Sequence, residues 1–147
     1  MKTFLSHSLK ETQKLAHDWL ASLSQPTAED GATIVGLYGN LGAGKTAFTQ
    51  AVARELGIME PTTSPTFVIE KFYETKHPFF KRLIHIDAYR LDAGRELQAL
   101  DFEKLVENHN NLILIEWPEN VKEILPENHL KIHCEFVDET TRKFEVQ

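Results

Sequence analysis

Residues 39–46 of this chain of 147 residues form a glycine-rich run, and they read Gly39-Asn40-Leu41-Gly42-Ala43-Gly44-Lys45-Thr46. The run matches the pattern Gly-x-x-x-x-Gly-Lys-Ser/Thr, whose backbone N–H groups wrap a phosphate at the start of a helix. Lys45 would reach the β- and γ-phosphates, and the Thr46 hydroxyl would bind Mg²⁺. At average residue frequencies, chance produces the pattern in about 0.5% of chains this long. We therefore assign all eight residues, together with the following Ala47, to a nucleotide-binding site.

The segments on either side of the run provide the context that such a loop needs. Residues Thr33–Tyr38 are rich in β-forming side chains without a clean alternation, as in a strand buried on both faces. After the run, apolar residues recur at helical spacing up to Leu56, and Gly57 stands where a helix usually stops. The chain is thus predicted to be a single P-loop NTPase domain over residues 1–147. Its fold class would be α/β, with a mostly parallel central sheet flanked by helices.

Periodicity and turn residues predict the remaining elements. Ser8-Leu9-Lys10-Glu11 has the form of a capping box, so a helix is expected from Leu9 to Leu23. The other expected helices are short pieces between residues 95 and 107 and one over 118–125, and the other expected strands cover 66–73, 82–87, 112–116, 129–137 and 142–146. The last two strands are predicted to form a C-terminal hairpin at the edge of the sheet.

The composition argues against several classes of protein. A net charge of −6 without clusters of Lys and Arg is unsuited to solitary nucleic-acid binding. Cys134 is the only cysteine, which rules out an internal disulfide or a thiolate metal site and fits a small buried side chain. The sequence has neither the apolar segment of a signal peptide nor a run of 18 apolar residues. We expect a cytoplasmic protein that has no membrane contact and meets RNA only through other proteins.

Hydrolysis at such a loop needs a carboxylate beside the metal and a group that orients the attacking water. Glu116 follows Leu112–Ile115, the usual form of a Walker B strand, and Asp87 follows another apolar strand. Both are candidates because ligands lie beyond the carboxyl ends of parallel strands, although either could instead cap a helix or meet a surface lysine. His85 could be a ligand or a base, but a histidine within a strand is more often packed and hydrogen-bonded. The guanine-reading tetrapeptide Asn-Lys-x-Asp is missing, which favours ATP.

Four motifs resemble, in order along the chain, those of the TsaE family (also called YjeE), bacterial ATPases required for threonylcarbamoyladenosine modification of tRNA. They are the glycine-rich run, Ser64-Pro65-Thr66-Phe67, His85-Ile86-Asp87-Ala88-Tyr89-Arg90 and Leu114-Ile115-Glu116-Trp117-Pro118-Glu119. The first motif alone is unspecific, whereas the combination is specific. The resemblance implies binding of ATP and Mg²⁺, slow hydrolysis, and work alongside TsaB and TsaD.

The resemblance also implies roles for individual residues. It places Thr46 and Glu116 on the metal side, and it makes Asp87 the group that orients or deprotonates water. Thr66 would face the γ-phosphate, and Arg142 and the stretch Ser8–Thr12 would lie near the adenine. Two more assignments complete the site: Lys45 is given a catalytic as well as a binding role, and Trp117, directly beside Glu116, is assigned to nucleotide binding.

Three functions remain open on the sequence alone. The first is an accessory ATPase that drives or resets a tRNA-modifying complex. The second is a small-molecule P-loop kinase, in which Asp87 and Arg90 would hold a substrate hydroxyl and an anion. Against it, the sequence shows no Arg-rich lid segment to exclude water from the phosphoryl donor. The third is a nucleotide-dependent binding module without useful turnover.

Overall fold

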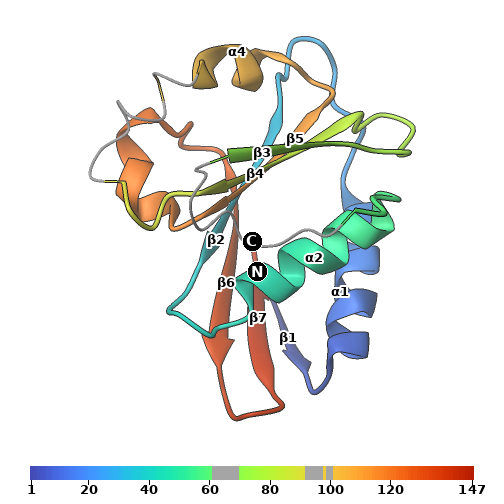
Figure 1. Cartoon of the computed structure of the whole chain (residues 1–147), viewed down its shortest axis with the longest axis vertical. Helices are drawn as coiled ribbons and strands as arrows, with labels where there is room; N and C mark the ends of the chain where they lie inside the picture. The colour runs from blue at the N-terminus through green and yellow to red at the C-terminus, as the bar shows by residue number, and fades with distance from the viewer. Residues whose placement is uncertain (61–69, 92–97, 99–100) are drawn as a thin grey trace.

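The structure, a computed structural model, describes residues 1–60, 70–91, 98 and 101–147. Seven strands form one sheet, and helices lie on both of its faces (Figure 1). The elements are β1 (Lys2–Ser6), α1 (Leu9–Ser22), β2 (Thr33–Tyr38), α2 (Lys45–Glu55), β3 (Glu70–Glu74), β4 (Arg82–Asp87), α4 (Phe102–Glu107), β5 (Asn111–Glu116), the 3₁₀ helix η1 (Pro118–Ile124), β6 (Leu130–Phe136) and β7 (Arg142–Val146). The parts of the predicted strand 66–73 and of the predicted helical pieces 95–107 that fall on residues 66–69, 95–97, 99 and 100 lie outside the described residues.

The centre of the sheet is parallel, and its flanks are antiparallel. In the strand order β1-β7-β6-β2-β5-β4-β3, the strands from β6 to β4 pair in parallel, whereas β3, β7 and β1 pair antiparallel with their neighbours. The ends of β2, β4 and β5 therefore meet at one edge, where ligands of α/β sheets bind. This arrangement confirms the predicted α/β class and P-loop NTPase architecture.

Apolar side chains on alternate positions of the central strands build two cores. In β5, Leu112 and Leu114 belong to the core under α1 and α2, whereas Ile113 and Ile115 belong to the core under α4 and η1. Every residue of β5 is buried, which explains the continuous apolar run in its sequence. In Figure 1, α1 and α2 lie side by side on one face of the sheet. The core under them includes Cys134, and burial raises the pKa of this thiol to about 12, as fits the structural role predicted for it.

The C-terminal hairpin of β6 and β7 forms as predicted, but a further strand lies outside it. Strand β1 pairs antiparallel with β7, from Lys2 opposite Val146 to Ser6 opposite Arg142, so β1 and not the hairpin occupies this edge. The sequence did not reveal β1 because four of its five residues are exposed and its partner lies about 140 residues away. The pairing brings the two termini together (Figure 1).

Local sequence determines where the two long helices begin and end. The Ser8 hydroxyl accepts a hydrogen bond from the Glu11 N–H at 3.1 Å, a cap typically worth about 1 kcal/mol. The Glu11 carboxylate in turn accepts from the backbone N–H of His7. Helix α2 ends at Glu55 with Leu56 as its C-cap, and Gly57 follows with φ of 78°, as predicted from the glycine.

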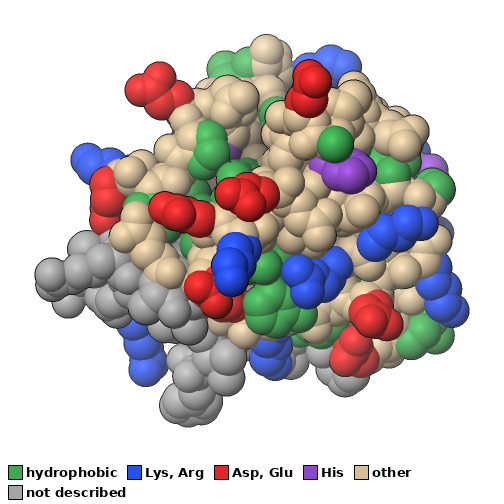
Figure 2. Space-filling view, turned by 90° about the horizontal axis from the view of Figure 1, so that it is seen from above, with side chains coloured by type: hydrophobic (Ala, Val, Ile, Leu, Met, Phe, Trp, Pro, Cys, Tyr) green, Lys and Arg blue, Asp and Glu red, His purple; other side chains and the backbone are tan. Residues whose placement is uncertain are grey.

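The surface carries both signs of charge. In the view of Figure 2, acidic and basic side chains are interspersed over the described part of the face, without one continuous basic patch. No helix in the described ranges is long and apolar enough to cross a membrane.

Candidate nucleotide-binding site

The glycine-rich run forms the turn from β2 into α2. Gly39, Gly42 and Gly44 have φ of 146°, 79° and 108°, which side chains rarely adopt. A Cβ on Gly39 would also lie 2.3 Å from the Cys134 carbonyl oxygen, so this position requires glycine for space as well. Gly44 is the N-cap of α2 and supplies no side-chain acceptor, which leaves the first N–H groups of the helix for an anion.

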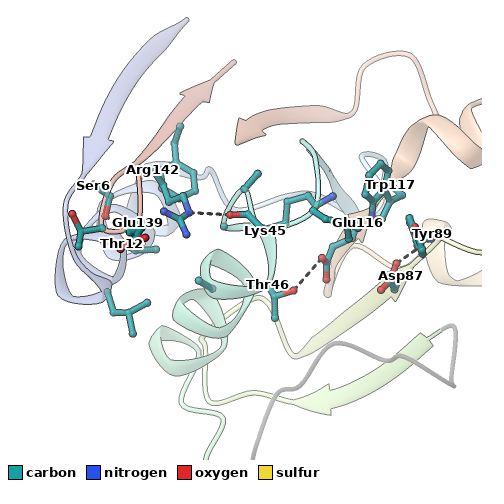
Figure 3. A pocket seen from close by; sticks show the side chains of 18 of the residues that line it. Ser6, Thr12, Lys45, Thr46, Asp87, Tyr89, Glu116, Trp117, Glu139 and Arg142 are labelled. Atoms are coloured by element: carbon teal, nitrogen blue, oxygen red, sulfur yellow. Dashed lines mark hydrogen bonds between the residues drawn. The ribbon is translucent and has the colours of Figure 1, made fainter. Parts of the chain in front are cut away.

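A cavity of about 1000 Å³ opens over this turn. Its walls include the phosphate loop, the residues after β4 and β5, the β1–α1 turn and the β6–β7 turn. In Figure 3, Ser6, Thr12, Glu139 and Arg142 lie at one end, and Asp87, Tyr89, Glu116 and Trp117 lie at the other. We call these the hairpin end and the carboxylate end; Lys45 and Thr46 lie between them.

Lys45 has its amine at the centre of the site. The amine donates a hydrogen bond to the Gly39 carbonyl and lies 3.5 Å from the centroid of the Trp117 ring. Lys45 is only 5% exposed, and burial lowers the pKa of its amine, although nearby Glu116 opposes the shift. A desolvated cation beside the N-terminus of a helix is suited to receive an anion.

Thr46 and Glu116 belong to different elements, and their side chains contact each other in the cavity. The Thr46 hydroxyl, in the first turn of α2, donates to Oε1 of Glu116 at the end of β5, at 3.2 Å (Figure 3). Among the described residues no group of three or more His, Cys, Asp and Glu side chains could hold a metal. One carboxylate and one hydroxyl nevertheless fit Mg²⁺, which prefers oxygen ligands and usually completes its shell with waters and phosphates.

Asp87 lies beside Glu116 because their strands pair in parallel. The two residues are register partners at the ends of β4 and β5. Asp87 lines the cavity, and its Oδ1 accepts a hydrogen bond from the Tyr89 N–H at 3.0 Å. The turn after Asp87 is fixed to β5 and η1, since the Ala88 N–H donates to the Glu116 carbonyl and the Asn120 side chain donates to the Ala88 carbonyl, both at 2.9 Å.

The comparisons with known proteins agree with these observations. Residues 6–144 match the sequence model of the family described as Threonylcarbamoyl adenosine biosynthesis protein TsaE. The chain belongs to the TsaE family. The tRNA threonylcarbamoyladenosine biosynthesis protein TsaE of Rickettsia felis is 37% identical over 134 residues, which are 90% of this chain and 72% of that protein.

Two further relatives cover different shares of the chain. The protein of the same name from Mycobacterium bovis is 34% identical over 110 residues, which are 71% of this chain. The match spans only 64% of the length of the mycobacterial protein. The crystal structure of YdiB from Bacillus subtilis is 26% identical, with a TM-score of 0.75, and the match covers 99% of this chain and 83% of YdiB.

In this TsaE-family chain, most of the residues predicted from the sequence line one cavity. These are Leu41, Gly42, Ala43, Gly44, Lys45, Thr46, Ala47, Asp87, Glu116, Trp117 and Arg142. Gly39 and Asn40 are not among the lining residues, but both make hydrogen bonds within the phosphate loop. The Gly39 carbonyl accepts from the Lys45 amine, and the Asn40 carbonyl accepts from the Ala43 N–H. Thr66 lies outside the described residues.

Trp117 and Arg142 contact the phosphate loop from opposite ends of the cavity. Trp117 adopts φ of 60°, a strained conformation for a bulky residue that typically costs about 1–3 kcal/mol, and its ring packs on the Lys45 amine and at 5.0 Å from Tyr89. Arg142 donates from Nε to the Gly42 carbonyl at 3.0 Å and from Nη1 to the Asp138 carbonyl at 2.6 Å. Both side chains thus brace the loop, and their contact with a nucleotide remains a prediction.

Three polar side chains of the site escaped the sequence analysis or were left undecided. At the hairpin end, Ser6 is buried and shares a hydrogen bond of 2.7 Å with Thr12. Asn120 fixes the turn after Asp87, as described above. His85 is buried beneath Glu116 and hydrogen-bonded to it. Only the burial of His85 had a signal in the sequence, namely its place within an apolar strand.

Proposed function

We propose that this chain is an ATP-binding and slowly ATP-hydrolysing accessory protein for threonylcarbamoyladenosine modification of tRNA, acting with TsaB and TsaD. The observation that carries the proposal is a phosphate cradle formed by residues 42–46, beside which the described residues of the cavity supply few groups for catalysis. Residues 42–46 offer backbone N–H groups, a buried ammonium and a hydroxyl to a triphosphate. Among the described residues that line the cavity, the lysine and arginine side chains besides that of Lys45 are those of Arg90 and Arg142.

We expect a nucleotide to lie along the length of the cavity. The phosphates would lie along residues 42–46, and the adenine would extend toward the hairpin end. Mg²⁺, when bound, would neutralise the charge that develops on the phosphates, with Thr46 and Glu116 as its protein ligands. Asp87, at the carboxylate end, would orient the attacking water or accept its proton.

We propose that hydrolysis is slow because of how the arginines of the cavity are placed. Phosphoryl transfer is accelerated by positive charge on the equatorial oxygens, and an arginine there is worth on the order of 10³–10⁵ in rate. Among the described lining residues the arginines are Arg90 and Arg142. Arg142 already donates to backbone carbonyls at the hairpin end, and Arg90 is exposed. A partner protein that closes the cavity would exclude water and strengthen each electrostatic contact.

The pathway is proposed from the relatives and from the surface. Proteins named for tRNA threonylcarbamoyladenosine biosynthesis are 34% and 37% identical to this chain. A net charge of −6 does not favour direct binding of tRNA, so the partners would hold it.

Complementation tests this proposal. Bacterial cells depleted of their own TsaE-family protein would receive this chain or its Lys45→Ala variant, and threonylcarbamoyladenosine in total tRNA would be measured by mass spectrometry. We expect the parent chain to restore the modified nucleoside and the variant to fail at equal protein level. Equal restoration by both chains would refute a role for nucleotide binding, and failure of both chains at normal expression would refute the role in this pathway.

A further inference from the structure

The one buried histidine of β4 is hydrogen-bonded to the predicted metal ligand. His85 is fully buried, and its Nε2 lies 2.6 Å from Oε2 of Glu116, which is itself 3% exposed. The pairing of the strands explains the contact. His85 lies opposite Leu114 in the register of β4 and β5, two residues before Glu116, so the two side chains are diagonal neighbours on one face of the sheet.

The two carboxylate oxygens of Glu116 are held by different partners. Oε1 accepts from the Thr46 hydroxyl on the cavity side, while Oε2 is bound to His85 on the buried side. Rotation of the carboxylate would break the short contact with His85 and leave polar atoms without partners in a buried place, which is costly. The side chain of Glu116 is therefore fixed by its inner oxygen, and only Oε1 is presented to the cavity.

We propose that His85 is a positioning residue for the metal site: its Nε2–H fixes Glu116 so that Oε1 stays beside the Thr46 hydroxyl, ready to ligate Mg²⁺. This inference rests on the proposed function, since it concerns the metal that accompanies ATP. Groups that hold the ligands of a metal typically contribute about 10–100-fold to its affinity.

The geometry argues against the direct roles that the sequence left open for His85. Its side chain does not line the cavity, and its Nε2 is already engaged with Glu116, so it reaches neither a metal ion nor a water beside the phosphates. Its Nδ1 has no hydrogen-bond partner within the described ranges. A bare ring nitrogen is a less costly buried group than an unpaired N–H, so the proton belongs on Nε2, where it is donated to the carboxylate.

Three substitutions of His85 distinguish a role in positioning Glu116 from a role in packing alone. His85→Leu keeps the volume and removes the donor. His85→Gln keeps an N–H donor at a similar reach, and His85→Asn keeps the amide but is one methylene shorter. The matched control is His17→Leu, because His17 makes a comparable contact with a carboxylate, 2.7 Å to Glu55, on the surface between α1 and α2.

The measurement is the affinity for Mn²⁺, a spectroscopic substitute for Mg²⁺, determined by electron paramagnetic resonance with a saturating non-hydrolysable ATP analogue. Affinity for the analogue without metal is measured alongside. We expect His85→Leu and His85→Asn to weaken Mn²⁺ binding about 10–100-fold. Metal-free nucleotide affinity should stay within about twofold of the parent, and His85→Gln and His17→Leu should bind Mn²⁺ nearly as the parent does.

Three other outcomes are possible, and each has a defined consequence for the inference. If His85→Leu binds Mn²⁺ like the parent, His85 only packs. If His85→Leu does not fold, the pair His85→Gln and His85→Asn decides, and equal Mn²⁺ affinity in the two contradicts positioning. If the parent itself binds no Mn²⁺ with the analogue, the proposed function fails and the inference fails with it.

Discussion

The two ends of the cavity are built differently. Toward the carboxylate end, Lys45 and Glu116 are buried, and the side chains of Lys45, Thr46 and Glu116 each have a hydrogen-bond partner. At the hairpin end, Leu9 is 76% exposed, and Glu139 and Thr140 are exposed on a turn. If the cavity binds ATP as proposed, phosphate and metal would meet side chains that are already buried and hydrogen-bonded, whereas the base would meet a more exposed surface. Most of the affinity for ATP should therefore come from its phosphates.

The largest effect is expected at the centre of the cradle. Lys45→Ala removes the buried ammonium that would meet the β- and γ-phosphates, so kcat/KM for ATP should fall by on the order of 10³ or more, by loss of binding and of transition-state charge together. Binding of inorganic tripolyphosphate should be lost in parallel. The control is Lys14→Ala, which removes an exposed lysine of α1. Unchanged affinity for both ligands in Lys45→Ala would refute the assignment of the phosphate loop.

A large effect on rate alone is expected at the carboxylate end. Asp87→Asn should lower kcat on the order of 10²-fold while ATP affinity stays within a few fold, because an orienting or proton-accepting group acts in the transition state. Asp18→Asn, an exposed aspartate on α1, is the matched control. Steady-state kinetics and equilibrium binding of ATP separate the two effects. Normal turnover in Asp87→Asn would leave Asp87 with the structural role of capping its own turn.

Glu116→Ala should impair hydrolysis by weakening the binding of Mg²⁺. The Mg²⁺ concentration for half-maximal hydrolysis should rise by at least about 10–100-fold, the loss typical when only a residue that holds a metal ligand is removed, whereas affinity for ATP in the presence of a chelator should change little, because the loop backbone holds the phosphates. The comparison is made by titrating Mg²⁺ at saturating ATP. An unchanged Mg²⁺ dependence would remove Glu116 from the metal side and make Asp87 the candidate ligand.

The smallest effect is expected at the hairpin end. Leu9→Ala removes apolar surface against which the base would pack, and burial of about 30 Å² corresponds to a change in ATP affinity of about threefold. Binding of tripolyphosphate, which has no base, should not change. An equal loss for both ligands would contradict the division of the cavity into two ends.

Sequence reasoning captured the carboxylate end better than the hairpin end, and the reason is physical. The phosphate loop is one continuous segment, and Glu116 and Asp87 follow apolar strands whose ends must meet in a parallel sheet. Alternation in β4 and β5 even places His85, Asp87 and Glu116 on one face. Their contacts, however, depend on β4 being the neighbour of β5, which no local pattern encodes.

The hairpin end depends on contacts between distant segments. Ser6 becomes part of the wall only because β1 pairs with β7, and the Arg142 side chain reaches the Gly42 carbonyl across 100 residues of sequence. An exposed five-residue strand and a single arginine carry no periodicity that would predict such contacts. The family resemblance supplied Arg142 as a candidate, whereas its brace on the phosphate loop was visible only in the fold.

The central claim, a complete phosphate cradle that needs a partner for catalysis, is tested most directly by steady-state ATPase measurements on the purified chain, alone and with purified TsaB and TsaD. We expect turnover by the isolated chain well below about 1 s⁻¹, the lower end of the range of self-sufficient kinases, and clear acceleration by the partners. The same partners should not accelerate Lys45→Ala. Turnover of about 1–100 s⁻¹ by the isolated chain, or slow turnover that the partners leave unchanged, would contradict the account.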